Sequence, residues 1–119
     1  MHCEALAEVD WQCADDTVVR PDVLIASNIQ GEKLTKTPEL IVEVVSPSSA
    51  KRDEGLKFEL YQQEGVKTYI LAYLEEKVAK GYRLHVGCYI KVSDFIDEQF
   101  DFKIKECDLN IDFSQIWRN

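Results

Sequence analysis

The chain has 119 residues, of which 45% are hydrophobic and 30% are charged. This composition is typical of a soluble globular protein, and the length predicts a single domain over residues 1–119 with one core. The net charge of −8 has the wrong sign for tight, non-specific binding to nucleic acid. No apolar run approaches the roughly 20 residues of a membrane-spanning helix, and no signal peptide opens the chain. We therefore expect a cytoplasmic protein with no membrane partner.

The four cysteines are Cys3, Cys13, Cys88 and Cys107. They lie far apart in the sequence and include no CxxC pair, and the chain has only two histidines. This pattern does not fit the ligand spacing of a structural zinc site. We expect the cysteines to be reduced and mostly structural.

The first part of the chain predicts two strands. The alternating segment 5–11 could form an edge strand, and Val23 to Ala26 predicts a buried strand. Pro21 belongs at a strand start or on an edge because it has no N–H for the ladder. Asp22 is therefore expected at the start of the buried strand. Residues 27–37 read as a loop.

The central part of the chain carries an acidic residue inside an apolar run. Leu40 to Val45 is mostly β-branched, which is typical of a strand buried on both faces of a sheet. Glu43 interrupts this run, and a carboxylate is costly to bury unless it meets a cation or a full set of donors. A helix is expected next, from about Ala50 to Glu64. Gly65 is suited to the left-handed conformation that ends a helix.

The rest of the chain reads mainly as strands. The expected elements are a strand at 68–74, a hairpin over 78–92 closed near Gly87, alternating segments around 100–104 and 109–111, and a short helical turn within 112–117. Strands, one clear helix and then more strands predict an α/β or α+β fold with a sheet of mixed direction.

Asp22 and Glu43 are the candidate site residues. If their strands are neighbours, the two carboxylates can converge on one Mg²⁺ or Mn²⁺, a hard ion that prefers oxygen ligands and keeps several waters. Such an ion could lower the pKa of a bound water and stabilise the charge that develops on a phosphate, with a nearby lysine assisting. The alternative role for Asp22 is a turn-capping carboxylate at a strand start.

Several segments together resemble a known family. They are Arg20-Pro21-Asp22-Val23, the run PELIVEVVSPSS at 38–49, Arg52-Asp53, Lys57, Tyr61, and GVKTY at 65–69. This combination resembles the Uma-type putative restriction endonucleases of the PD-(D/E)xK superfamily, from about Ala7 to the C-terminus. The resemblance implies a restriction-endonuclease-like α/β fold, with a mixed sheet and a flanking helix after the Glu43 strand. It also implies metal-dependent cleavage of DNA.

The resemblance implies roles for three residues. Asp22 and Glu43 would bind Mg²⁺ or Mn²⁺, and Lys57 would be the third catalytic residue. Most of the superfamily has a lysine two positions after the second acid, where this chain has Val45. In this family a lysine from the following helix is thought to substitute. Lys57 could instead form only a surface i,i+4 pair with Asp53, which contributes a few tenths of a kcal/mol.

The neighbours of these residues have simpler expectations. Ser46 and Ser49 are both candidates for the helix N-cap, and the sequence leaves open which one serves. Tyr61 and Tyr69 are expected to be core aromatics whose hydroxyls reach the edge of the site. Glu39 is expected to be solvated.

Members of this family usually have further helix and strands ahead of the segment that opens this chain. The resemblance therefore implies an N-terminally short copy, whose apolar surface a second copy could cover in a homodimer. It leaves open a catalytically inactive binding or assembly module, and it leaves open RNA as the substrate. The acidic surface predicts that contact with DNA is weak and strongly metal-dependent.

Overall fold

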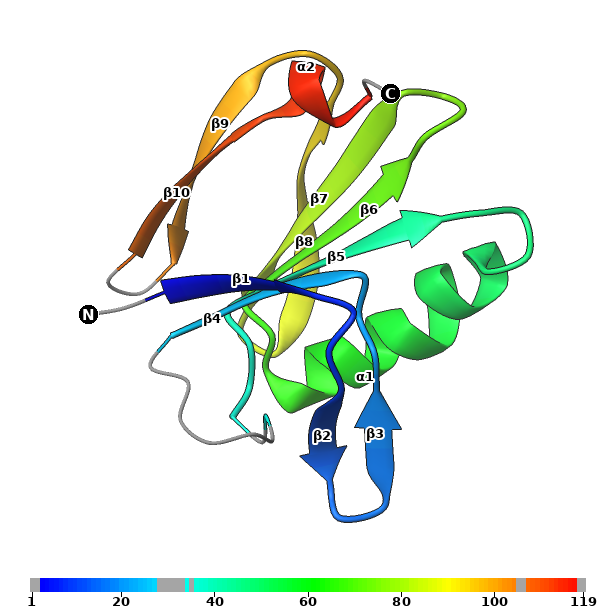
Figure 1. The fold of residues 1–119 in the computed structure, drawn as a ribbon, viewed down its shortest axis with the longest axis vertical. Helices are drawn as coiled ribbons and strands as arrows, with labels where there is room; N and C mark the ends of the chain where they lie inside the picture. Colours follow the sequence, from blue (N-terminus) through cyan, green and yellow to red (C-terminus); the bar gives the residue numbers. More distant parts are fainter. Residues whose placement is uncertain (1–2, 28–33, 35, 105–106, 118–119) are drawn as a thin grey trace.

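The computed structural model describes residues 3–27, 34, 36–104 and 107–117 (Figure 1). Its centre is a six-stranded sheet in the order β1-β4-β5-β6-β7-β8. The bounds are β1 (Cys3–Ala7), β4 (Val23–Ser27), β5 (Leu40–Val45), β6 (Thr68–Tyr73), β7 (Val78–His85) and β8 (Cys88–Phe95). Strands β5 and β6 pair in parallel and the other neighbours are antiparallel. The predicted α/β fold with a mixed sheet is confirmed.

The remaining elements flank this sheet. They are β2 (Trp11–Ala14), β3 (Thr17–Val19), the π-helical turn η1 (Arg52–Leu56), α1 (Lys57–Glu64), β9 (Gln99–Ile104), β10 (Cys107–Asp112) and α2 (Phe113–Ile116). Figure 1 shows α1 along one face of the sheet, and the β9–β10 hairpin with α2 on the opposite side. The β2–β3 hairpin extends from the ends of β1 and β4 and lies beside α1.

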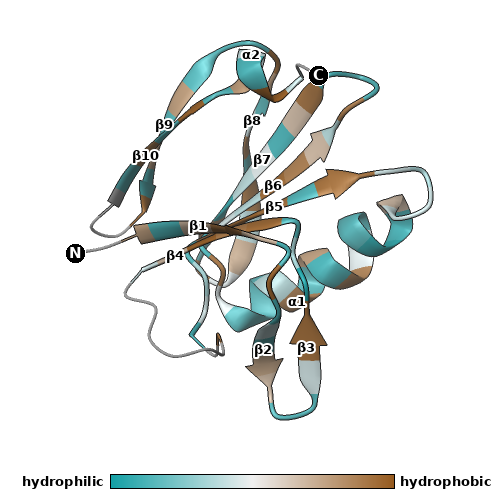
Figure 2. Ribbon diagram, in the orientation of Figure 1, coloured by the Kyte–Doolittle hydropathy of each residue, from teal (hydrophilic) through white to brown (hydrophobic). Residues whose placement is uncertain are grey.

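Side chains of the central strands alternate between two buried clusters, because successive residues of a strand point to opposite faces. Ile41 belongs to the cluster that includes Tyr61 of α1. Leu40, one residue earlier, belongs to the cluster that includes Phe113 of α2. Figure 2 shows the resulting concentration of apolar residues in β4, β5 and β6. The prediction that β5 is buried on both faces holds for these residues but fails at Val44, near the strand end, which is exposed.

Most predicted elements appear at or near their expected positions. The strand over 40–45, the helix over 50–64 and the hairpin closed near Gly87 are all present. Gly65 ends α1 in the left-handed conformation, with φ of 85°. The predicted strand over 5–11 is instead split between β1 and β2, because the chain turns at Glu8, whose φ is 53°. The predicted loop at 27–37 lies largely outside the described residues.

Two smaller expectations are corrected. Cys3 is disulfide-bonded, so the prediction of reduced cysteines is wrong for this residue, whereas Cys13 and Cys88 are free. Glu39, expected to be solvated, is buried. Its backbone continues the sheet, since its N–H donates to the Ile25 carbonyl and its own carbonyl accepts the N–H of Thr68. Within the described ranges, no helix has the length and apolarity needed to cross a bilayer.

Candidate active site

Asp22, directly before β4, lies beside Glu43 of the neighbouring strand β5. Strands β4 and β5 are antiparallel, and Val23 pairs with Val42, so Asp22 comes opposite Glu43 one step further along the ladder. The Asp22 backbone N–H donates to Glu43 Oε1 at 3.1 Å. The Val44 N–H in turn donates to Asp22 Oδ2 at 2.6 Å. The expected adjacency of the two acid-bearing strands is therefore present.

Glu43 is a buried carboxylate with donors on both oxygens. Its side chain is only 1% exposed. Oε2 accepts a hydrogen bond from the Tyr61 hydroxyl at 2.7 Å and another from Lys57 Nζ at 3.0 Å. Burial raises the pKa of the Glu43 carboxyl, and the bonds from Tyr61, the Asp22 backbone and Lys57 counter part of that rise. These donors and the lysine cation account for the acid inside an apolar strand.

Lys57 bridges two buried carboxylates. Besides Glu43, its Nζ lies 3.4 Å from Asp53 Oδ1, and its side chain is 19% exposed while that of Asp53 is 3% exposed. The alternative of a surface pair between Lys57 and Asp53 is therefore wrong. The pair exists, but it is buried and Glu43 shares the lysine. Lys57 of the helix therefore places a cation beside Glu43, whereas Val45, two residues after Glu43, has no charge to offer.

A π-helical turn brings Asp53 and Lys57 to the sheet. The Lys57 N–H donates to the Arg52 carbonyl, an i→i+5 bond that widens the helix just before α1. Of the two serines ahead of it, Ser46 Oγ accepts the N–H of Ser49 at 3.2 Å, as a capping residue does. Ser49 Oγ donates instead to Asp53 Oδ2 at 2.8 Å. Single π turns inside helices occur frequently at functional sites.

Tyr61 and Tyr69 are fully buried, and their rings meet edge to face with centroids 5.1 Å apart. Both hydroxyls reach the site as expected, since Tyr61 bonds Glu43 and Tyr69 donates to the Asp53 carbonyl at 2.8 Å. Burial, with Glu43 nearby, raises the pKa of both phenols well above the usual range, so both remain donors. The direct Tyr61–Glu43 bond was not predicted. The spacing of four residues from Lys57 to Tyr61, which places them on one helix face, is the signal that could have found it.

The two acids fit a hard divalent cation. Asp22 Oδ1 accepts no hydrogen bond from the described part of the chain, and Glu43 Oε1 accepts one. Each carboxylate therefore keeps lone pairs for a ligand. Among the described residues there is no group of three or more His, Cys, Asp or Glu side chains that could hold a metal. Mg²⁺ commonly takes one or two carboxylates and completes its shell with waters and substrate phosphates, so two acids suffice for it.

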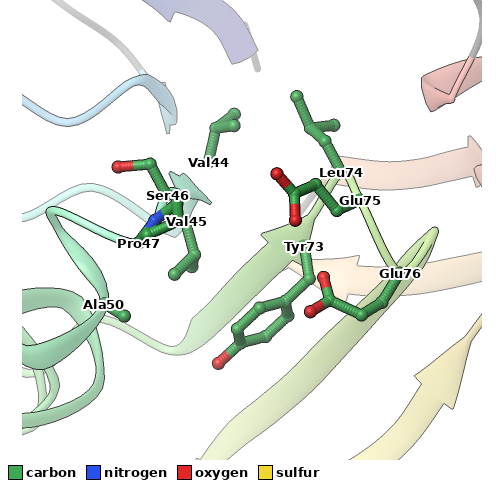
Figure 3. A pocket seen from close by; sticks show the side chains of 9 residues that line it. All are labelled: Val44, Val45, Ser46, Pro47, Ala50, Tyr73, Leu74, Glu75 and Glu76. Carbon is green, nitrogen blue, oxygen red and sulfur yellow. The ribbon is translucent and has the colours of Figure 1, made fainter.

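Two hollows lie against the elements that carry the site. One, of about 340 Å³, lies at the ends of β5 and β6 and is lined in part by Ser46, Tyr73, Glu75 and Glu76 (Figure 3). Figure 3 shows the side chains of Glu75 and Glu76 on the β6 side, across from Ser46. The other, of about 540 Å³, lies between β3 and the helix, and Lys57 is part of its wall. Cations line the second hollow and acids the first.

The fold and the site together define a class of protein, a mixed-sheet α/β domain that presents two acids from adjacent strands and a lysine from the helix that follows. The sequence profile of the Uma2 family, described as putative restriction endonucleases, matches residues 2–104. This chain belongs to that family, as the sequence resemblance predicted.

A solved structure has the same fold. It is the crystal structure of a putative nuclease belonging to DUF820 from Anabaena variabilis ATCC 29413, which matches with a TM-score of 0.72 at 16% sequence identity. The match covers 97% of this chain and 68% of that chain. At this level of identity the likeness concerns the fold. A comparison with curated proteins gave no match.

Proposed function

We propose that this chain is a divalent-metal-dependent endonuclease that hydrolyses phosphodiester bonds of DNA. The observation that carries the proposal is the convergence of Asp22, Glu43 and Lys57 where β4, β5 and the helix meet. The family description as putative restriction endonucleases and the description of the solved neighbour as a putative nuclease support the reaction class.

In this proposal Asp22 and Glu43 would hold Mg²⁺ or Mn²⁺, because both carboxylates keep lone pairs that their hydrogen bonds do not use. When bound, such an ion lowers the pKa of a water and stabilises charge on the phosphate. The Asp22 N–H and the Tyr61 hydroxyl fix the orientation of the Glu43 carboxylate. Because metal binding needs the ionised carboxylate, the raised pKa of Glu43 makes metal affinity increase with pH.

Lys57 supplies a positioned cation. An ammonium has three N–H groups, of which one on Lys57 donates to Glu43, while the ammonium also forms an ion pair with Asp53 at 3.4 Å. A further N–H of Lys57 can donate to a phosphoryl oxygen or to the attacking water, and the partial exposure of the side chain gives access from solvent. Such a fixed donor stabilises the charge that develops in the transition state without reorganisation.

Plasmid nicking tests the proposal. We expect the wild-type chain to nick supercoiled DNA with Mg²⁺ or Mn²⁺. Asp22→Asn and Glu43→Gln, which keep the shape of each side chain but remove its charge, should lose this activity. Glu59→Gln changes an exposed acid of α1, the helix that carries Lys57. It is the matched control and should cleave DNA normally. Parallel assays with an RNA substrate decide between the two nucleic acids.

A negative result is equally informative. If the wild-type chain cleaves neither DNA nor RNA with either ion, and calorimetry detects no Mn²⁺ binding, the nuclease proposal is wrong. The chain would then be an inactive module that has kept the fold.

A further inference from the structure

The hollow between the β2–β3 hairpin and the start of the helix carries an unusual charge. Arg20, directly after β3, lines it together with Arg52 of η1 and Lys57 of α1. Among the described residues that form its wall, none is acidic. In a chain with a net charge of −8, three cations around one hollow are complementary to phosphate groups.

Both arginines keep donors for a ligand. Arg20 Nε donates to Asp10 Oδ1 at 2.8 Å, and both side chains of this pair are mostly exposed. The bond orients the Arg20 guanidinium but leaves its terminal N–H groups unused. Arg52 is exposed and forms no ion pair with the described part of the chain. Two exposed guanidiniums therefore line the same hollow as Lys57 and keep N–H groups for a ligand.

The same hollow has apolar side chains on both walls. Val18 of β3 is 55% exposed and Leu56 of η1 is 74% exposed, and both line it. Covering apolar surface of this kind with a ligand is favourable, because it removes that surface from water. The flat faces of nucleobases are such a ligand only when the bases are unpaired, because stacking hides them in a duplex.

We propose that this hollow binds an unpaired segment of the strand to be cut, so that the chain acts on single-stranded or locally unpaired DNA. Arg20 and Arg52 bind the phosphates that flank the scissile one at Lys57, and Val18 and Leu56 contact the base between them. A volume of about 540 Å³ is in the range of small-molecule sites, roughly 300–1,000 Å³, and so takes a nucleotide or two of one strand. The inference rests on the proposed nuclease function and specifies the form of its substrate.

Fluorescence anisotropy tests the binding step without cleavage. The probes are a labelled single strand of about ten nucleotides and its duplex, with Ca²⁺ in place of Mg²⁺. We expect the single strand to bind at least about tenfold more tightly than the duplex. Arg20→Gln and Arg52→Gln should each weaken this binding about fivefold and reduce the salt dependence by about 0.7 per lost phosphate contact. Arg83→Gln, an exposed arginine of β7 beside a different hollow, is the matched control and should bind as wild type.

Leu56→Ser separates the base contact from the charge. Leu56 is mostly exposed, so the substitution should leave the fold intact, weaken the single-strand complex and leave the duplex complex unchanged. Equal affinity for single strand and duplex, or arginine variants that behave like Arg83→Gln, would overturn the inference. If the wild-type chain nicks plasmid but Arg20→Gln and Arg52→Gln bind the single strand as wild type does, only this substrate assignment is refuted. If the single strand binds through Arg20 and Arg52 but the chain cleaves no nucleic acid, the nuclease proposal is refuted and the single-strand binding site stands.

Discussion

Glu43 shows how a single buried acid is tolerated in an apolar strand. Its donors are the Asp22 backbone, directly before β4, and the side chains of Tyr61 and Lys57, from two successive turns of the helix. Burial still dominates the balance, because the pKa of this carboxyl remains above its ordinary value of 4.5. The folded state therefore holds the Glu43 proton more tightly than the unfolded chain does.

This difference predicts a pH dependence of stability. Between pH 4.5 and the raised pKa the folded state binds more protons, so the Glu43 contribution to the free energy of unfolding falls as pH rises and is constant above that pKa. Glu43→Gln should remove this component. Urea unfolding from about pH 4 to pH 8 should show the variant gaining stability relative to wild type across the window, while Glu59→Gln should track wild type. A constant difference between wild type and Glu43→Gln would contradict the prediction.

Lys57 has a structural role beside its proposed catalytic one. Lys57→Met should destabilise the fold by roughly 3 kcal/mol, the lower end for a broken buried ion pair, because Glu43 and Asp53 lose their shared cation. Urea unfolding near neutral pH measures this loss. Lys51→Met, an exposed lysine of the same helix, should stay within about 0.5 kcal/mol of wild type. A Lys57→Met variant as stable as wild type would show that the bridge contributes little.

At the scale of elements, the helix after β5 presents Asp53, Lys57 and Tyr61 to the acids of the sheet. Its π turn gives Lys57 its place, and its C-terminus at Gly65 lets the chain return to β6. The Gly65 N–H bonds back to the carbonyls of the last turn. The helix end therefore depends on a left-handed residue that has no Cβ.

Gly65→Ala should destabilise the protein by about 1–2 kcal/mol, since the left-handed conformation strains a residue with a Cβ. The space around Gly65 is open, so the cost comes from the backbone alone. Gly55→Ala is a matched control in the same helix, where the space is also open and φ is not left-handed. It should stabilise the protein by up to about 1 kcal/mol. Thermal unfolding with equal effects at the two glycines would contradict the prediction.

On the scale of the whole molecule, the sheet is covered by different elements on its two faces. Helix α1 and the β2–β3 hairpin cover the face with the site, and the β9–β10 hairpin with α2 covers the other (Figure 1). On that second face Phe113 stacks on Phe95 with centroids 4.5 Å apart and ring planes 4° from parallel. A substitution on the second face should therefore lower the stability of the fold without changing metal binding at the site on the first face.

Phe113→Ala should cost about 3–5 kcal/mol of stability, because a fully buried ring is removed from the second face. Mn²⁺ affinity at a temperature where the variant is folded should stay near that of wild type, since the acids lie on the other face. Calorimetric titration and urea unfolding of the same preparation measure both. Loss of Mn²⁺ binding by folded Phe113→Ala would show that the faces are coupled.

The whole-molecule expectations from the sequence stay predictions. The net charge of −8 predicts that DNA binding is weak without a divalent ion. The cytoplasmic location is checked by cell fractionation and the homodimer by sedimentation. The single-domain organisation is checked by a single cooperative unfolding transition.

The sequence by itself determined the order of the main elements and pointed to the two candidate acids. Alternation and β-branching place the strand at 40–45, and the serine-proline sequence and Gly65 bound the helix. The family resemblance proposes Asp22, Glu43 and Lys57 as the candidate site residues. These signals are local, because they depend on backbone preferences and on residues close together along the chain.

Only the tertiary structure decided which of these groups meet. It buries Asp53 rather than leaving it at the surface, gives Glu43 a bond from Tyr61, and separates the roles of Ser46 and Ser49. It also splits the segment around Glu8 into two strands and forms the cationic hollow beside β3. Burial, pKa and hydrogen-bond partners depend on contacts between segments far apart in sequence, and local patterns do not contain those contacts.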